Sequence, residues 1–371
     1  MGNPGLLWGG VLGCRARAVN PTVSVTLRLS WERIAMPPIR TFCFSLPVAI
    51  CLTSLVFADA PLEVDRENEE FTLIVLPDTQ RYALYFPEIF HAQTRWIKEN
   101  LDELNTKFVV HVGDVVDEQT DQEWFVADRA FAELDDAVPY LVVPGNHDLE
   151  KDASGRLIRN TTKYNAVFSP HRFAGKSWYG GHNGVTNDNS FAYFEAAGQQ
   201  FMVLGLEYGP SDETLAWAKT LISDHHQIIL VTHAYMYDDD TRLGPGDRWS
   251  PKKSDPSWND GEDIWEKLIS RRDNVFMVLS GHVKGDGTGL LVSRTNDGAP
   301  VIQMLANYQF LEHGGQGWLR ILHFQPAKGV LSVHTYSPWL KKSREEPDQR
   351  FNLDIAHVFK TTGACLLRQA K

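Results

Sequence analysis

Five short polar motifs in the middle of this chain contain the residue types that bind divalent metal ions. They are Pro77-Asp78-Thr79-Gln80, Gly113-Asp114-Val115-Val116-Asp117, Gly145-Asn146-His147-Asp148, Thr232-His233 and Gly281-His282-Val283-Lys284. Carboxylate, amide and imidazole groups supply the oxygen and nitrogen ligands that such ions prefer. The motifs therefore predict metal chemistry, provided that the fold brings them together.

An apolar segment of strand type precedes each motif. These segments cover residues 71–76, 108–112, 140–143, 228–231 and 275–279. The polar side chains therefore follow the carboxyl ends of five predicted strands, which is the edge where α/β sheets bind ligands. One motif alone would be weak support for a site, but five in the same structural position indicate one shared site.

The order of the motifs resembles that of the calcineurin-like metallophosphoesterases over about residues 71–340. This chain departs from the family pattern at Gln80 and at Lys284, which both stand where the family has a histidine. The sequence around residues 76–80 and 93–97 is similar to a bacterial secreted branch in which the glutamine is usual.

The resemblance implies two neighbouring metal positions that share Asp114. The second position would be complete, with Asp114 as the bridging ligand and Asn146, His233 and His282 as the others. One carboxylate, one amide oxygen and two imidazoles suit Mn, Fe, Zn or a similar divalent ion. Taken singly, Asn146 is open to an alternative role as a turn residue, and the two histidines as core side chains.

The first metal position would be incomplete. Asp78 and Asp114 remain, and Gln80 offers a carbonyl oxygen, which is an acceptable hard ligand. Lys284 as an ammonium has three donors and no acceptor, so it cannot bind a cation. We expect the charged Lys284 to replace part of a cation's charge, with a side chain turned into solvent as the alternative. One tightly bound ion is therefore expected, with a second ion weak or absent.

His147, Asp148 and Lys284 are the catalytic candidates. The resemblance implies that His147 lies near the phosphate as a proton donor or charge stabiliser. Asp148 beside it would orient the imidazole and favour its charged form. The alternative is a histidine that only shapes the turn. Asp117 is expected to brace its loop rather than to bind metal.

The order of predicted elements indicates an α/β fold. Apolar helical faces follow the first two strands at 89–104 and 124–134, and strands with little helix between them dominate from residue 191. Two further helices are expected at 213–223 and 261–271. This order predicts two packed mixed sheets with outer helices, and the resemblance implies the same four-layer α/β/β/α sandwich.

Two long segments flank the predicted strands of the site. Residues 149–189 and 235–260 are rich in glycine and polar residues. Long loops in compact domains are often functional, so we expect both to form walls of the site.

The first 60 residues have the pattern of a targeting segment. A basic start at 36–40, an apolar stretch at 42–57 and small residues at 58–60 are typical of a secretory signal peptide that begins at Met36. A membrane anchor is the alternative, although a span needs about 20 apolar residues. We predict export to the periplasm, cell surface or medium, and no stable membrane span after removal of the signal. The predicted divisions are an over-extended start at 1–35, the signal at 36–58, one metallophosphoesterase domain at 66–340 and a tail at 341–371.

The charge balance limits the class of partner. The formal net charge is -11 and the isoelectric point is about 5.6. An acidic chain is disfavoured as a general nucleic-acid or anionic-membrane binder. A phosphorylated substrate remains compatible, because bound cations would invert the local field.

The function that these observations predict is hydrolysis of a phosphoester by a metal-activated water. The alternative is a non-catalytic or weakly active protein on the same fold that binds metal or a phosphate ligand. Both departures from the family pattern fall on the first metal position, which is what loss of hydrolysis would produce. The substrate and the preference for mono- or diesters are not encoded in these patterns.

Overall fold

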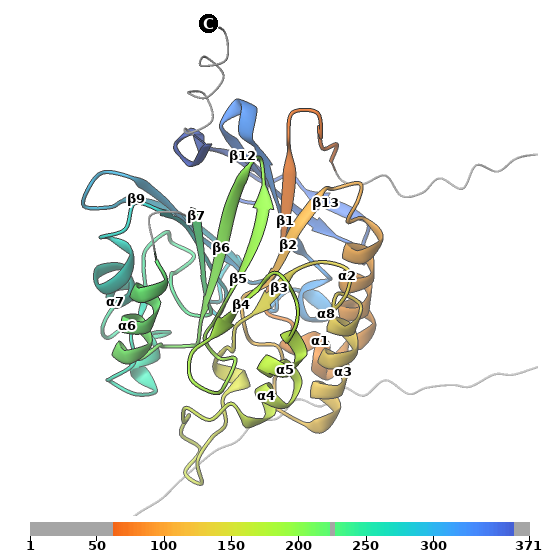
Figure 1. Ribbon diagram of the computed structural model, residues 1–371. Helices are drawn as coiled ribbons and strands as arrows, with labels where there is room; N and C mark the ends of the chain where they lie inside the picture. The colour runs from red at the N-terminus through yellow and green to blue at the C-terminus, as the bar shows by residue number, and fades with distance from the viewer. Residues whose placement is uncertain (1–61, 223–226, 360–371) are drawn as a thin grey trace, which may run out of the picture. The chain divides into compact units, whose positions relative to one another are not determined.

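Two sheets of seven strands each form the centre of the computed structural model, which describes residues 62–222 and 227–359 (Figure 1). The first sheet has the order β13-β12-β11-β1-β2-β3, with β14 also paired to β12, and the second has the order β4-β5-β6-β7-β8-β10-β9. The strands of the first sheet are β1 (Phe71–Leu76), β2 (Thr106–His111), β3 (Tyr140–Val142), β11 (Leu319–Gln325), β12 (Val330–Ser337), β13 (Lys342–Arg344) and β14 (Phe351–Asp354). The strands of the second sheet are β4 (Tyr179–His182), β5 (Ser190–Ala196), β6 (Gln199–Leu206), β7 (Gln227–Thr232), β8 (Val275–Ser280), β9 (Thr288–Arg294) and β10 (Pro300–Ala306).

Helices cover the outer face of each sheet. The α-helices are α1 (Gln80–Tyr85), α2 (Pro87–Glu99), α3 (Asp121–Ala132), α4 (Thr162–Phe168), α5 (Pro170–Phe173), α6 (Asp212–Leu221), α7 (Gly261–Ile264) and α8 (Glu312–Gly315). Apolar side chains of α2 and α3 pack on the first sheet, and those of α6 and α7 pack on the second (Figure 1). The predicted α/β/β/α sandwich is therefore confirmed.

The central strands are apolar on both faces because each lies between two layers. In β1, Phe71, Leu73 and Val75 belong to the core between the sheets, whereas Ile74 and Leu76 pack against the helices. Alternate residues of a strand point to opposite faces, so a continuous apolar run is what a strand covered on both faces needs. This is why the predicted strands 71–76 and 275–279 coincide so closely with β1 and β8.

The parallel strands leave the site motifs at one edge of each sheet. β1 is parallel to β2, and β2 to β3. In the second sheet β6, β7, β8 and β10 are parallel to one another in that order. The loops at the two edges are joined, because the Nδ1 atom of His233 lies 2.8 Å from the Val112 carbonyl. Within the second edge, Gly281 N donates to the His233 carbonyl over 2.9 Å.

A capping box holds the loop of the Asp114 motif to helix α3. The Thr120 hydroxyl accepts a hydrogen bond from Glu123 N, and the Glu123 carboxylate accepts one from Thr120 N. The same carboxylate also accepts hydrogen bonds from Asp117 N and Glu118 N. A helix start of this kind satisfies otherwise unpaired N–H groups, and here it also fixes the position of Asp117.

The structure corrects three details of the predicted fold. The domain does not end at residue 340, because β13 and β14 pair with β12 and the 3-10 helix Ala356–Phe359 follows. The segment 149–189 is not a continuous loop, since it contains α4, α5 and β4. The helix expected at 261–271 is α7 followed by a π-helix at Trp265–Ile269.

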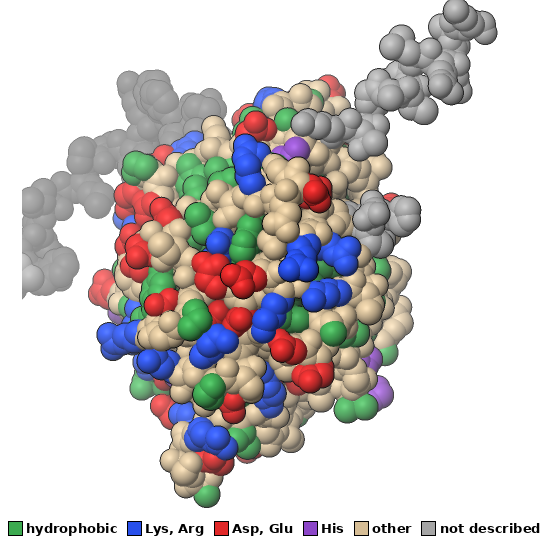
Figure 2. Space-filling model, turned by 90° about the vertical axis from the view of Figure 1, so that its left-hand side faces the viewer, with side chains coloured by type: hydrophobic (Ala, Val, Ile, Leu, Met, Phe, Trp, Pro, Cys, Tyr) green, Lys and Arg blue, Asp and Glu red, His purple; other side chains and the backbone are tan. Residues whose placement is uncertain are grey.

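The face over α6 and α7 carries charges of both signs side by side (Figure 2). Ion pairs join several of them, including Lys252 with Asp263 and Lys267 with Asp212. Among the residues that the structure describes, no helix is long and apolar enough to cross a membrane. The predicted start and signal peptide at 1–58 lie outside the described residues.

Candidate metal centre

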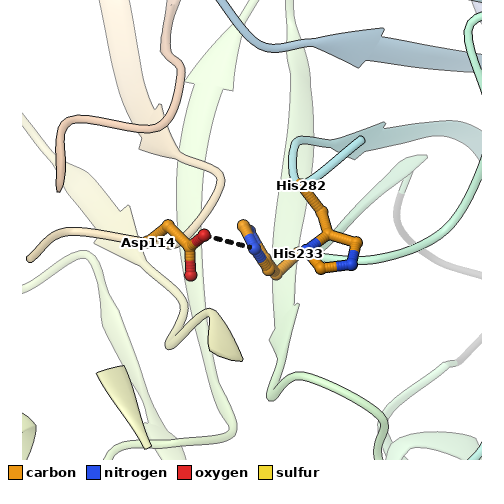
Figure 3. Close-up of side chains that lie close together, drawn as sticks. All are labelled: Asp114, His233 and His282. Atoms are coloured by element: carbon orange, nitrogen blue, oxygen red, sulfur yellow. Dashed lines mark ion pairs between the residues drawn. The ribbon is translucent and has the colours of Figure 1, made fainter. Parts of the chain in front are cut away.

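Asp114, His233 and His282 converge in the interior, with one ligand atom of each within 4.8 Å of the others. All three are buried. Figure 3 shows the Asp114 carboxylate facing the His233 ring, with His282 beside it; Asp114 Oδ2 lies 3.1 Å from His233 Nε2. Three of the four predicted ligands of the second metal position thus come from the ends of β2, β7 and β8.

Backbone carbonyls fix both imidazoles in the orientation that ligands require. His233 Nδ1 lies 2.8 Å from the Val112 carbonyl, and His282 Nε2 lies 3.1 Å from the Trp249 carbonyl. A carbonyl only accepts, so each of these nitrogens donates its hydrogen. In the neutral rings, the form that binds metal, the lone pair then belongs to His233 Nε2 and to His282 Nδ1, which is the usual way in which proteins orient metal-binding histidines.

Two buried acceptor oxygens of the predicted ligand set have no hydrogen-bond partner. They are Gln80 Oε1 and Asn146 Oδ1, whereas His233 Nε2 has Asp114 Oδ2 beside it at 3.1 Å. A buried polar atom without a partner costs about 1–3 kcal/mol, and most such atoms in proteins are satisfied. Divalent ions at the two predicted positions would satisfy one oxygen each, so the side chains present fit the metal centre that the sequence predicts.

Two ligand residues have strained backbone conformations. Asp114 has φ of 53° and His282 has φ of 72°, in the left-handed region that residues other than glycine rarely adopt. Such strain is found where the surrounding structure must aim a side chain, often at a functional site. Here the two strained residues are the ones whose side chains converge on His233.

The two carboxylates of the centre respond differently to burial. Burial raises the pKa of Asp78 to about 8, although Asp78 accepts hydrogen bonds from His282 N and from Gln309 Nε2. Burial acts on Asp114 in the same direction, but the adjacent His233 imidazole outweighs it and holds the pKa of Asp114 below its usual range. The same contact raises the pKa of His233 to about 9 against the opposing effect of burial.

Gln80 has a buried side-chain oxygen without a hydrogen-bond partner. Its Nε2 donates a short hydrogen bond to Asp117, and Arg81 donates to the other oxygen of the same carboxylate over 2.8 Å. Since the nitrogen is held by Asp117, the buried Oε1 is left for another partner. This is the arrangement that a glutamine ligand needs.

The partner of His147 is Asp117 and not Asp148. His147 Nδ1 lies 2.9 Å from the Asp117 carbonyl and 3.3 Å from its carboxylate. Burial opposes charge on this ring, but Asp114 and Asp117 raise the pKa of His147 above its ordinary value. Asp117 was predicted only to brace its loop, but it also holds the His147 ring.

Asp148 faces the backbone. Its carboxylate accepts hydrogen bonds from Val115 N, Val116 N and Gly145 N at 2.8 to 3.1 Å. Adjacency in sequence suggested that it orients His147, but the 3-10 turn Asn146–Asp148 directs the two side chains to different partners. Asp148 joins the loops that carry Asp114 and Asn146.

Lys284 does not lie among the ligands. Its Nζ is 4.2 Å from the centre of the Phe310 ring and 5.5 Å from that of Trp249. Within residues 62–222 and 227–359, no ion pair joins it to Asp78 or Asp114. The expectation that its charge substitutes for a cation beside these carboxylates is corrected: the exposed side chain forms cation–π contacts instead.

Sequence patterns missed three residues that shape the centre. His111 accepts from Gly113 N and lies 2.9 Å from the Thr79 hydroxyl, so it joins two motif loops. Trp249, in the predicted wall 235–260, supplies the carbonyl that orients His282. Gln309 contacts Asp78, and its only signal was its place after the apolar run 301–305.

A cleft of about 490 Å³ adjoins the centre. Asn146 and His147 line it together with Asp117, Lys151 and Lys163. The predicted wall 149–189 thus does border the site. A substrate in this cleft would contact the exposed part of His147, whose side chain is 36% exposed.

The sequence matches the family model of the calcineurin-like phosphoesterases over residues 71–285. The chain therefore belongs to this family, whose general chemistry is metal-dependent hydrolysis of phosphoesters.

One curated relative and two solved structures are similar to this chain. The relative is the uncharacterized protein YvnB of Bacillus subtilis (strain 168), 36% identical over 306 residues, which are 79% of this chain and 22% of YvnB. This chain thus spans about a fifth of that relative's length. Purple acid phosphatase PPD1 of yellow lupin (Lupinus luteus) is 11% identical with a TM-score of 0.47, over 77% of this chain and 54% of the other. A dimetal phosphatase of Danio rerio is 14% identical with a TM-score of 0.45, over 77% of this chain and 99% of the other.

Proposed function

We propose that this protein hydrolyses a phosphoester with one tightly held and one weaker divalent ion. The observation that carries the proposal is the pair of unpartnered, buried acceptor oxygens on Gln80 and Asn146. These atoms belong to the two predicted ligand groups that share Asp114. Family membership supports the reaction class, and the donor set of the second position suits Mn, Fe or Zn.

The residues divide into a metal-binding set and a substrate-facing set. Asp114, Asn146, His233 and His282 would hold the tight ion, and Asp78, Gln80 and Asp114 the weaker one. Bound divalent ions would supply a Lewis acid and activate water at neutral pH. His147, held by Asp117 and bordering the cleft, can place a proton on the leaving oxygen or stabilise negative charge on the phosphoryl group.

Turnover of p-nitrophenyl phosphate and of bis(p-nitrophenyl) phosphate tests this proposal. The chain is stripped of metal, reloaded with Mn²⁺ or Zn²⁺, and compared with His147→Asn. Loss of a proton donor should lower kcat on the order of 10²- to 10⁴-fold and leave the metal content unchanged. His171→Gln, on the exposed part of α5, is the control and should keep the wild-type rate.

A second candidate function is binding of a phosphate ligand without turnover. It is favoured by the two family departures, Gln80 and Lys284, and by the contacts of the Lys284 ammonium with the Phe310 and Trp249 rings. If the reloaded chain binds metal and inorganic phosphate but hydrolyses neither ester, this candidate replaces the first.

We also propose that the protein is exported after cleavage near Asp59. The basic, apolar and small-residue order of residues 36–60 supports this proposal. N-terminal sequencing of protein recovered from outside the cytoplasm should begin near residue 59. A chain that retains residue 1 and stays in the cytoplasm would contradict it.

A further inference from the structure

Gln309 lies against the first metal position, although it belongs to none of the five motifs. Its amide Nε2 donates to Asp78 Oδ2 over 2.8 Å, and the residue is only 6% exposed. A primary amide carries a donor nitrogen and an acceptor oxygen on the same carbon. A half-turn about the last side-chain bond exchanges the two atoms without moving the rest of the residue.

The sheet edge and the neighbouring loop hold Gln309 in this place. Gln309 follows β10, which is parallel to β8, so it leaves the same edge as His282. Asn307 Nδ2 donates to the Val283 carbonyl over 3.3 Å, and Asn307 Oδ1 accepts from Gln309 N over 3.1 Å. The loop of Gln309 is thus tied to the loop between His282 and Lys284.

The residue that contacts Asp78 is Gln309 and not Lys284. The Lys284 ammonium lies over the Phe310 ring, next in sequence to Gln309. The residue that the family motif would make a ligand therefore turns toward an aromatic ring. The amide of Gln309 contacts the Asp78 carboxylate instead.

We propose that Gln309 is the ligand that completes the first metal position, through its amide oxygen. The donor set of that position would then be Asp78, Gln80, Asp114 and Gln309, which are all oxygen ligands. Oxygen sets suit hard ions such as Mn²⁺ and Mg²⁺, whereas the imidazoles of the second position suit Zn²⁺. This inference rests on the proposed function, because it concerns the same metal centre.

Metal titration of the stripped, full-length chain tests the inference without an activity assay. The second position is first filled with one equivalent of Zn²⁺, and Mn²⁺ is then added while free Mn²⁺ is measured by electron paramagnetic resonance. Gln309→Ala should weaken Mn²⁺ binding by at least about 10-fold and retain the Zn²⁺. Gln309→Glu should bind Mn²⁺ at least as tightly as wild type, because it adds a carboxylate ligand. Gln325→Ala, at the far end of β11, is the control and should match wild type.

The two glutamine variants separate a ligand from a simple hydrogen-bond donor. If Gln309 only donates to Asp78, then Gln309→Glu repels that carboxylate and weakens Mn²⁺ binding as Gln309→Ala does, which overturns the inference. Unchanged Mn²⁺ binding by Gln309→Ala overturns it as well. Retained Zn²⁺ in these cases leaves the proposed function standing, whereas a wild-type chain that binds neither ion contradicts the proposed function itself.

Discussion

Gln80 and Asn146 each keep one buried acceptor oxygen without a hydrogen-bond partner. Such an atom makes the metal-free protein less stable than a fully satisfied interior would be. Binding of an ion to the folded chain alone raises its stability by mass action. The metal centre should therefore be visible in unfolding measurements as well as in metal content.

Asn146→Ala should abolish the rise in melting temperature that Mn²⁺ or Zn²⁺ produces in wild type. The metal-free variant should be no less stable than metal-free wild type, because the lost oxygen had no partner in the protein. Differential scanning calorimetry with and without metal measures both quantities. Asn100→Ala is the control: it loses a 2.7 Å hydrogen bond to the Trp96 carbonyl, and should be destabilised yet keep the metal-induced shift.

Lys284→Ala should keep the tightly bound metal, because the ammonium lies over Phe310 and Trp249 rather than beside the carboxylates. Loss of an exposed cation–π contact should lower the free energy of unfolding by roughly 0.5–1 kcal/mol. Elemental analysis and denaturant unfolding measure the two effects. If the variant bound no metal, the conclusion that Lys284 lies outside the ligand set would be wrong.

At the scale of the elements, close approach of the strand-end loops explains the glycines that begin two of the motifs. A Cβ added at Gly145 would lie 2.2 Å from Asp114 Oδ1, and one at Gly281 would lie 2.2 Å from Asp78 Oδ1. Real Cβ atoms do not come so near. Each glycine therefore allows the loop of one strand to pass directly against a carboxylate from another.

Gly145→Ala should displace Asp114 and weaken metal binding by at least about 10-fold. Gly145 has a φ of -90°, so the effect comes from lack of space and not from backbone strain. Isothermal titration with Zn²⁺ gives the affinity. Gly244→Ala should bind metal as wild type does, since its nearest neighbour would be 3.6 Å away; equal affinities in all three proteins would exclude the steric explanation.

The strands that support the centre were predictable, because burial on both faces requires continuous apolar runs such as those of β1 and β8. The edge strands β13 and β14 were not, because their exposed or half-buried residues carry no such run. The contact of Gln309 with Asp78 joins residues 231 positions apart. No local pattern encodes it, because Asp78 follows β1 of the first sheet and Gln309 follows β10 of the second.

The partner of His147 could not be read from the sequence for a different reason. Asp148 is adjacent in the chain, but the turn Asn146–Asp148 directs its carboxylate to backbone N–H groups. Asp117, which lies 30 positions away, takes its place. Spacing identified the residues of the centre, whereas the direction of each side chain depends on backbone angles that spacing does not encode.

At the scale of the whole molecule, the first sheet holds the buried His323 and the half-buried His334 away from the metal centre. Burial lowers the pKa of His334 to about 4, and Arg350 acts in the same direction. Burial also lowers the pKa of His323 below its ordinary value, although the carboxylate of Glu70 opposes the shift. Both rings are therefore neutral in the folded protein at pH values where an unfolded histidine is charged.

His334→Gln should reduce the loss of stability on acidification. An unfolded histidine takes up a proton as the pH falls through about 6.5, whereas folded His334 does so only near pH 4. The unfolded chain then binds more protons, so His334 costs the fold increasing stability as the pH falls from about 6.5 to 4. Denaturant unfolding of metal-free protein at pH 7.5 and pH 5 should show a smaller difference for the variant, because glutamine does not titrate. The metal ligands and His323 are the same in both proteins, so the comparison isolates one ring; an equal loss in the two proteins would show that His334 is protonated in the fold as readily as in the unfolded chain.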